Sequence, residues 1–357
     1  MAEVFVRFLN REALGRLGVD DVAAAVADVR DALRLAADGA AAMPPETTVR
    51  FEDGPGERSE SQAEESPGEN PRGAAAAYAL PAHVGGRFDA VGVKWTAHRR
   101  ADADDGAPHI LSLTILNDAR TGRPVAILES ARITAMRTAA VSWLAIEHLG
   151  RSGAQCVGML GAGVQARTHL RMLAHEMPRL AEVLVWNRTA ARAEALAREL
   201  GREVPWPIRV EESVEAVTAE SPILITCTAA ATPIVERGAV RPGLLAIQVG
   251  FHEFSFEAIE AFDDVVVDAW GEFRLTSQKS LFQMHRAGRF PAERIAGDLA
   301  DLVWRGRELA PRRSVYVSSF GLSIFDVAIA ARLVKASEGA GIGLLLPLGG
   351  FSDGAWR

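Results

Sequence analysis

The residues with the clearest chemical meaning form a glycine pattern near the middle of the chain. An apolar run ending at Leu160 leads into Gly161-Ala162-Gly163-Val164-Gln165-Ala166, ahead of a helix expected over 168–177. In a dinucleotide-binding turn the first glycine permits the tight turn and the second lets the backbone approach a pyrophosphate. A small third residue lets helix and strand pack closely. The phosphates then lie at the positive end of the helix dipole. An ordinary glycine-rich turn is the alternative.

The elements around this turn favour the dinucleotide interpretation. Strands and helices alternate, which predicts a parallel, doubly wound sheet of the Rossmann type. The expected strands cover 155–160, 182–186, 208–210, 223–228, 244–249, 264–268 and 314–319, and the expected helices 168–177 and 190–200. The glycine turn therefore follows the first strand and opens the first helix.

The end of the second expected strand bears on the choice of cofactor. An NAD enzyme usually has Asp or Glu here for the ribose 2′-hydroxyl, and this chain has Asn187 with Arg188 and Arg192 close by. A guanidinium can form a charge-assisted fork to a 2′-phosphate. NADP(H) is therefore favoured and NAD(H) is possible, with Arg188 then only solvating a helix start.

The first part of the chain predicts an α+β domain whose sheet is antiparallel. Strands are expected over 4–9, 49–51, 74–80, 88–96, 110–116 and 125–128, with a helix over 20–37 and a hairpin at 117–122. The polar segment 52–72 has too little apolar surface to order itself, so we expect a mobile loop, either a plain insertion or a lid.

Two charged residues of this region have unusual positions. A helix over 130–149, with Ser130 as N-cap and Gly150 after its end, has an apolar stripe that includes Arg137. A core-facing arginine needs an anion, and a structural ion pair and a substrate carboxylate are equally open. Lys94 alternates away from Val93 and Trp95, which by itself predicts a solvated strand face. Near the C-terminal end, Ser323 and Asp326 have the spacing of a capping box before a helix over 327–337.

Composition excludes several classes of protein. The chain has 357 residues, of which 48% are hydrophobic and 24% charged, and a net charge of −7, which argues against a duplex-DNA footprint. No apolar run reaches the roughly 18 residues that span a bilayer. The N-terminus is too charged for a signal peptide. Cys156 and Cys227 fit small core residues, and the histidine spacing predicts no metal site. We expect a cytoplasmic protein with no nucleic-acid or membrane partner.

Three segments together resemble the ornithine cyclodeaminase/mu-crystallin family. They are Gly92-Val93-Lys94-Trp95, Ile133-Thr134-Ala135-Met136-Arg137-Thr138-Ala139-Ala140 and the glycine turn with Gln165; Thr228 and the segment from Phe320-Gly321 to Asp326 fit as well. The resemblance implies a homodimer with a substrate-binding and dimerisation domain over 1–131 and 322–357, and a Rossmann domain over 132–321. It also implies that Lys94 and Arg137 clamp the substrate carboxylate.

One segment departs from the family pattern. Ornithine cyclodeaminases have Gly-Ala-Asp after the fifth strand, where this chain has Gly250-Phe251-His252-Glu253. This is more similar to the branch of N-(2-amino-2-carboxyethyl)-glutamate dehydrogenases, which form 2,3-diaminopropionate, with Glu253 and His252 in the places of an Asp and an Arg. The usual Pro-Pro-Arg is here Pro44-Pro45-Glu46, and Arg50 is the nearest replacement.

The resemblance implies an NAD(P)-dependent oxidoreductase acting on a C–N bond of an amino acid. We expect it to oxidise a secondary-amine conjugate such as N-(2-amino-2-carboxyethyl)-glutamate, whose imine is hydrolysed to 2-oxoglutarate and 2,3-diaminopropionate. The alternatives are an ornithine or lysine cyclodeaminase, a ketimine reductase, or a mu-crystallin-like protein that binds NADPH and a small ligand. Catalysis is assigned to Glu253, His252 and Lys94, and substrate binding to Arg50, Lys94 and Arg137. Cofactor contacts are expected from Thr138, Gly161, Gly163, Val164, Gln165, Asn187, Arg188, Arg192, Thr228 and Gly321.

Overall fold

The computed structural model describes residues 3–51, 75–98, 108, 110–310 and 312–350. The predicted loop over 52–72 lies outside these residues. The chain divides into two compact units, of which the first comprises 1–137 and 323–357 and the second 138–322. The division falls within helix α3 (Ala131–His148). The substrate-binding and dimerisation role expected of the first unit stays a prediction.

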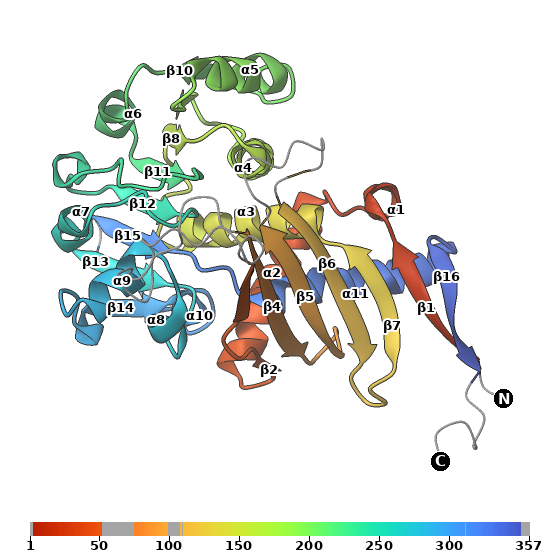
Figure 1. Cartoon of the computed structure of the whole chain (residues 1–357). Helices are drawn as coiled ribbons and strands as arrows, with labels where there is room; N and C mark the ends of the chain where they lie inside the picture. Colours follow the sequence, from red (N-terminus) through yellow and green to blue (C-terminus); the bar gives the residue numbers. More distant parts are fainter. Residues whose placement is uncertain (1–2, 52–74, 99–107, 109, 311, 351–357) are drawn as a thin grey trace, which may run out of the picture. The chain divides into compact units, whose positions relative to one another are not determined.

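The second unit is built on a parallel sheet of eight strands in the order β10-β9-β8-β11-β12-β15-β13-β14 (Figure 1). Every pairing in it is parallel. Its strands are β8 (Cys156–Leu160), β9 (Glu182–Trp186), β10 (Ile208–Val210), β11 (Ile223–Thr226), β12 (Leu245–Gln248), β13 (Asp264–Val267), β14 (Ile295–Asp298) and β15 (Val315–Ser318). The predicted doubly wound sheet is confirmed.

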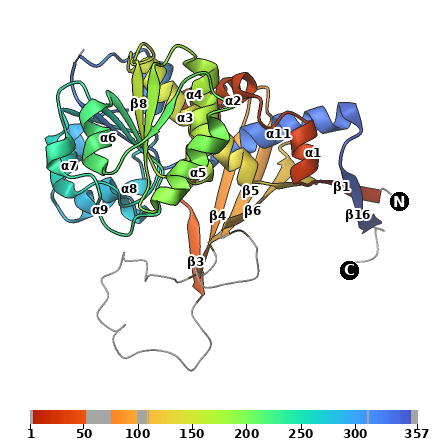
Figure 2. The ribbon, with the colours of Figure 1, turned by 90° about the horizontal axis from the view of Figure 1, so that it is seen from above.

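Helices cover both faces of this sheet. Figure 2 shows α4 and α5 on one side of β8 and α6 on the other. The helices of this unit, besides the end of α3, are α4 (Val164–Glu176), α5 (Ala190–Leu200), α6 (Val214–Glu220), α7 (Phe256–Ala261), α8 (Phe273–Thr276), α9 (Ser280–Arg286) and α10 (Leu299–Val303). The strand order reverses direction between β8 and β11, and ligands of such sheets bind outside the carboxyl ends of the strands at that point.

The first unit has a mixed sheet in the order β16-β1-β7-β6-β5-β4-β2, with β3 paired to β4. The strands are β1 (Glu3–Leu9), β2 (Ala41–Ala42), β3 (Thr47–Phe51), β4 (Ala75–Val84), β5 (Ala90–His98), β6 (Ile110–Asp118), β7 (Pro124–Glu129) and β16 (Leu344–Gly350). The expected hairpin joins β6 to β7. The expected antiparallel pairing holds for these described strands with one exception: β1, next to the edge strand β16, runs parallel to β7.

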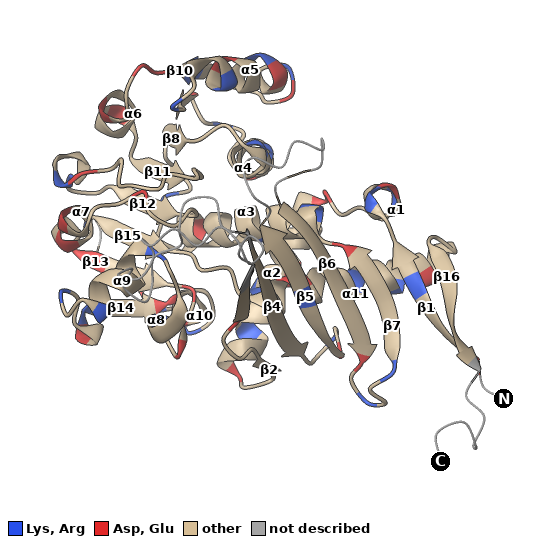
Figure 3. Cartoon of the chain, in the orientation of Figure 1, with Lys and Arg blue, Asp and Glu red and all other residues tan. Residues whose placement is uncertain are grey.

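Helices α2 (Val22–Ala37) and α11 (Ser323–Ala340) pack together in this unit, α2 on β4 and α11 on β4, β5 and β6; α1 (Arg11–Arg16) precedes α2. The strands β4 to β7 carry few charged residues (Figure 3). Their helix-covered face includes Lys94, only 4% exposed, whereas Trp95 on the opposite face is 43% exposed. The solvated-face interpretation of Lys94 is therefore wrong, since the helices cover its side of the sheet.

Two other expectations about helices change. Helix α3 is buried around its whole circumference from Ile133 to Ile146, not along one stripe. Helix α11 begins at Ser323, four residues earlier than expected. No helix among the described residues is both long and apolar enough to cross a membrane.

Candidate functional site

A charged cluster in the first unit joins β5, α3 and α11. The Lys94 Nζ atom lies 3.3 Å from Asp326 Oδ1, and the Arg137 Nε atom lies 3.2 Å from Asp326 Oδ2. Thr134 Oγ1 donates a hydrogen bond of 2.9 Å to Asp326 Oδ1. The Asp326 side chain is fully buried, and Lys94 and Arg137 are nearly so. Two cations therefore share one carboxylate in a buried place.

This cluster is not saturated. The Nε atom of Arg137 is buried and has no hydrogen-bond acceptor among the described residues. The buried Oδ2 atom of Asp326 likewise has no hydrogen-bond donor among them. Burial lowers the pKa of Lys94 to about 8, with Asp326 acting against this shift and Arg137 adding to it. The structure thus shows the ion pair that was one alternative for Arg137, and the surplus positive charge keeps the substrate alternative open.

Asp326 is a site residue that was not predicted from the sequence. The capping-box interpretation is wrong, because Ser323 is already the first residue of α11 and its hydroxyl donates to the Pro81 carbonyl at 3.1 Å. The Asp326 carboxylate points to Lys94 and Arg137 instead. The available signal was the pair of cations at 94 and 137, which requires an anionic partner somewhere in the chain.

Glu46, just before β3, acts on the same cluster. Burial raises the pKa of Glu46 to about 7, and the Lys94 ammonium opposes the shift. Arg50, predicted to bind substrate, lies in β3 opposite Ala76, and its side chain is outside the described residues. Its role stays a prediction.

In the second unit, the glycine turn has the form that a dinucleotide site requires. Gly161 has φ +113°, and a Cβ added there would lie 2.5 Å from the Cys227 carbonyl oxygen, so only glycine fits. Gly163 precedes the first residue of α4 and has open space where a Cβ would stand. Helix α4 begins directly at this turn, whereas we expected it at residue 168. The free N–H groups of its first turn can therefore receive a phosphate.

Other residues near this turn also fit a bound cofactor. The buried Gln165 Oε1 atom has no donor among the described residues, and Val164 is 67% exposed. Thr228 follows the carboxyl end of β11, the strand that pairs with β8. The buried Thr138 lies in α3, and Gly321 donates its N–H to the Asp268 carboxylate. A nucleotide would supply a donor to Gln165, so the residues of this edge fit the group.

The residues expected to contact the ribose of the cofactor follow β9. Asn187 Nδ2 donates to the Thr189 carbonyl at 2.9 Å, and the side chains of Arg188 and Arg192 are exposed. Within the described part of the chain neither guanidinium has an ion-pair partner, so both can reach an anion. Their role in cofactor binding stays a prediction.

The turn after β12 is held by buried charges. Glu253 is fully buried. Its Oε1 atom accepts hydrogen bonds from the N–H of Thr228 at 3.1 Å and from the hydroxyl of Thr228 at 3.2 Å, and its Oε2 atom accepts one from Gln248 Nε2 at 3.1 Å. Burial raises the pKa of Glu253, against the influence of Lys279. A Cβ at Gly250 would lie 1.9 Å from the Glu253 carboxylate, so this turn needs a glycine there.

Lys279, which was not predicted as a site residue, fixes the same turn. Its buried ammonium donates to three consecutive carbonyls, those of Gln248 at 3.3 Å, Val249 at 2.8 Å and Gly250 at 2.6 Å. His252 is half-buried, and burial lowers its pKa, with Lys279 adding to the shift. A neutral imidazole can accept a proton, whereas the Glu253 oxygens are already occupied.

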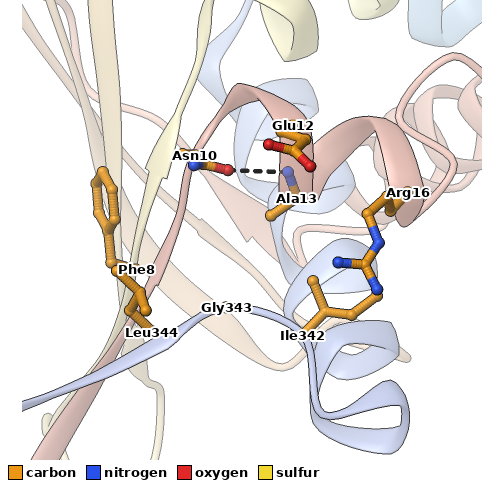
Figure 4. A pocket seen from close by; sticks show the side chains of 8 residues that line it. All are labelled: Phe8, Asn10, Glu12, Ala13, Arg16, Ile342, Gly343 and Leu344. Carbon is orange, nitrogen blue, oxygen red and sulfur yellow. Dashed lines mark hydrogen bonds between the residues drawn. The ribbon is translucent and has the colours of Figure 1, made fainter.

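A shallow pocket of about 210 Å³ lies elsewhere in the first unit (Figure 4). It contains none of the predicted site residues and is lined by Phe8, Asn10, Glu12, Ala13, Arg16, Ile342, Gly343 and Leu344. Among the described residues, no group of three or more potential ligands could hold a metal ion. The chemistry of the chain therefore concentrates in the two charged groups described above.

Comparisons with known proteins bear on the family to which this chain belongs. Residues 67–339 match the model of the ornithine cyclodeaminase/mu-crystallin family. The N-((2S)-2-amino-2-carboxyethyl)-L-glutamate dehydrogenase of Staphylococcus aureus is 28% identical over 76% of this chain and 81% of its own. The Δ1-pyrroline-2-carboxylate reductase of Bacillus cereus is 27% identical over 72% and 80%.

A solved structure extends the similarity to the fold. The Thermococcus litoralis Δ1-pyrroline-2-carboxylate reductase, in complex with NADH and L-proline, has a TM-score of 0.82 and 26% identity, covering 95% of this chain and 99% of its own. These relatives confirm the predicted class of enzyme, an oxidoreductase. With its glycine turn, its Lys94–Arg137 pair and a family match that spans both units, the chain belongs to the ornithine cyclodeaminase/mu-crystallin family.

Proposed function

We propose that this enzyme oxidises a C–N bond of an amino-acid substrate whose carboxylate binds to Lys94 and Arg137. The observation that carries the proposal is the buried cluster of two cations on one carboxylate, with Arg137 Nε lacking an acceptor among the described residues. A substrate carboxylate supplies the missing acceptor and, while Glu46 is protonated, also the missing negative charge. Removing an uncompensated buried charge is strongly favourable, so this contact anchors the substrate.

The cofactor is proposed to be NADP(H) in preference to NAD(H). Gly161, Gly163, Gln165 and the start of α4 would hold the pyrophosphate, and Asn187 with Arg188 and Arg192 would hold the ribose end. When bound, a nicotinamide accepts a hydride from the carbon of the C–N bond. A solved relative of this chain contains NADH, so the proposed preference for a 2′-phosphate is supported by Arg188 and Arg192 alone.

The proton chemistry is assigned to the turn after β12. His252 is accessible and neutral near pH 7, and we propose that its imidazole takes the proton from the water that attacks the imine. Glu253 is proposed to act through Thr228, by fixing the Thr228 N–H and hydroxyl at the carboxyl end of β11. It is therefore a positioning residue rather than the proton carrier.

The substrate we propose is a secondary-amine conjugate such as N-(2-amino-2-carboxyethyl)-glutamate, giving 2-oxoglutarate and 2,3-diaminopropionate. The support is the Staphylococcus aureus relative together with the Gly250–Glu253 segment. Reduction of a cyclic imine is the second candidate, because two similar proteins are Δ1-pyrroline-2-carboxylate reductases.

Steady-state assays distinguish these candidates. The purified enzyme is given the conjugate with NADP+ or NAD+, ornithine with the same cofactors, and Δ1-pyrroline-2-carboxylate with NADPH or NADH. We expect 2-oxoglutarate from the conjugate, with a higher kcat/KM for NADP+. Proline from ornithine, or fast reduction of the cyclic imine without conjugate turnover, would contradict the proposed substrate. Preference for NAD+ would contradict only the cofactor.

We further propose that the enzyme is a homodimer that uses the helix-free face of the first unit's sheet. Trp95, Leu111, Leu113 and Val49 on β3, β5 and β6 are each at least 41% exposed, which forms a large apolar surface. Such patches mark association sites. Light scattering is expected to give twice the chain mass for the wild type and the chain mass for Leu113→Glu. A wild-type monomer would contradict the proposal.

A further inference from the structure

Glu46 lies in line with Lys94 across the sheet of the first unit. Thr47 pairs with Ala79, and Leu80 pairs with Lys94. Glu46 directly precedes β3, and continuing the antiparallel register by one residue brings it opposite Leu80. Residues directly opposite one another project to the same face of a sheet. Glu46 is therefore directed to the face that carries Lys94.

The segment before β3 is held against the start of α11. The Ser323 N–H donates to Met43 Sδ at 2.9 Å, and the Ser323 hydroxyl bonds to β4 at Pro81. Asp326 follows one turn later on the same helix. These contacts hold the segment before β3 against the start of α11, and the Glu46 carboxyl and the Lys94 ammonium act on each other's charge.

The charges around Glu46 form two poles. Lys94 and Arg137 are cationic and share Asp326, whereas Glu46 is half-buried and is acted on by Lys94 alone among the described charged groups. His98 follows Lys94 on the same face of β5, and burial and the Lys94 charge lower its pKa, so it stays neutral. With Glu46 ionised, two cations face two carboxylates.

We propose that Glu46 binds the ammonium group of the substrate and restricts the enzyme to zwitterionic α-amino acids. The inference rests on the proposed function, which places the substrate carboxylate at Lys94 and Arg137. A zwitterion leaves the total charge of this cluster unchanged, because its carboxylate binds to Lys94 and Arg137 and its ammonium group binds to Glu46. A carboxylic acid without the amine leaves Glu46 as an unpaired anion beside a second anion.

Binding of matched ligand pairs tests the inference without turnover. The probes are L-proline, L-glutamate and L-ornithine, each paired with its counterpart lacking the α-amine: cyclopentanecarboxylate, glutarate and 5-aminopentanoate. Calorimetry at pH 8 compares the wild type, Glu46→Gln, Glu46→Asp and a control, Glu12→Gln, on the exposed side of α1. We expect the wild type and the control to prefer the best-bound amino acid over its counterpart by about 10- to 100-fold.

In Glu46→Gln this preference is expected to fall to about 3-fold or less, while the amine-free acid binds equally or more tightly. Glu46→Asp keeps part of the preference, which a purely structural role of the side chain does not predict. The wild-type preference also grows between pH 6 and pH 8 as Glu46 ionises, and Glu46→Gln removes that dependence.

The outcomes separate the two proposals. If the wild type prefers amino acids and Glu46→Gln retains the full preference, the role of Glu46 is wrong and the proposed function stands. If the wild type binds none of the six probes in the presence of either cofactor, both are wrong. Unchanged circular dichroism of Glu46→Gln shows that a lost preference is not a lost fold.

Discussion

The charged cluster around Asp326 in the first unit and the turn after β12 in the second unit compensate their buried charges in opposite ways. In the first unit Lys94 and Arg137 lie directly against a carboxylate, with more positive than negative charge at Asp326. In the second unit the Lys279 ammonium is surrounded by three carbonyls, and the Glu253 carboxylate by donors from Thr228 and Gln248. There, dipoles of the chain solvate each charge.

The difference indicates two kinds of task. A cluster with surplus charge and an unfilled donor gains from an ionic ligand, so it is suited to binding. A charge whose hydrogen bonds end on the backbone of one turn fixes the shape of that turn and gains little from a ligand. We therefore expect substitutions in the first group to change substrate affinity, and those around Lys279 to change stability and turnover.

The largest effect is expected from Arg137→Met. It removes one of the two cations and leaves the substrate carboxylate poorly compensated, so kcat/KM should fall by about 100- to 1000-fold, mainly through KM. Arg132→Met, on the same helix and paired with Asp20, serves as the control. A loss below 5-fold would show that Arg137 belongs only to a structural ion pair.

Lys279→Met should have the next largest effect, on stability. Three buried carbonyls lose their donor, so urea unfolding is expected to show a loss of about 2–3 kcal/mol. kcat should fall with the loosened turn while the KM for the amino acid stays within 2-fold. Lys335→Met, at an exposed position of α11, is expected to be neutral. A stable variant with a raised KM would show instead that Lys279 contributes to substrate binding.

Two glycine variants sharpen the description of the cofactor turn. Gly161→Ala combines a positive φ with a contact to the Cys227 carbonyl, so a loss of about 2 kcal/mol is expected. Gly163→Ala has room in the protein and should change stability by less than about 0.5 kcal/mol. Its methyl group stands where a pyrophosphate approaches, so NADPH affinity, followed by fluorescence, should fall at least about 10-fold. Equal NADPH affinity in Gly163→Ala and wild type would contradict this geometry.

The smallest effect is a pH dependence of stability. The pKa of Glu46 is about 7 in the folded enzyme, above its ordinary value, so the folded state holds the proton more tightly. This contribution is complete below pH 4.5 and is lost as the pH rises through 7. Relative to the wild type, Glu46→Gln should therefore melt about 2–4 °C higher at pH 8, and the difference should shrink by pH 5. Parallel melting curves across this range would rule out the buried carboxyl.

Local patterns made much of the second unit predictable. The apolar runs and the glycine turn are contiguous in sequence, so β9, α5 and β10 have the expected bounds, and the parallel sheet follows from their alternation. The family resemblance singled out Lys94 and Arg137, which the structure brings together at Asp326, while their role in substrate binding stays a prediction.

Partners that are distant in sequence were harder to predict. Asp326 fitted a local capping motif, while its actual partners lie 189 and 232 residues earlier, at positions 137 and 94. Lys279 belongs to no periodic pattern, and its acceptors are backbone atoms that any residue type provides. The face of Lys94 was misjudged because alternation shows that two faces differ but not which one the helices cover.

The close approach of Gly250 and Glu253 has a consequence for how this enzyme can be engineered. Any side chain at 250 would occupy the space of the Glu253 carboxylate, so a change at either position constrains the other. Engineering that exchanges residue 253 for a shorter one while keeping the glycine explores compatible turns. A side chain introduced at position 250 alone would displace the Glu253 carboxylate from its present hydrogen bonds to Thr228, so new specificities at this turn are best sought by varying both positions together.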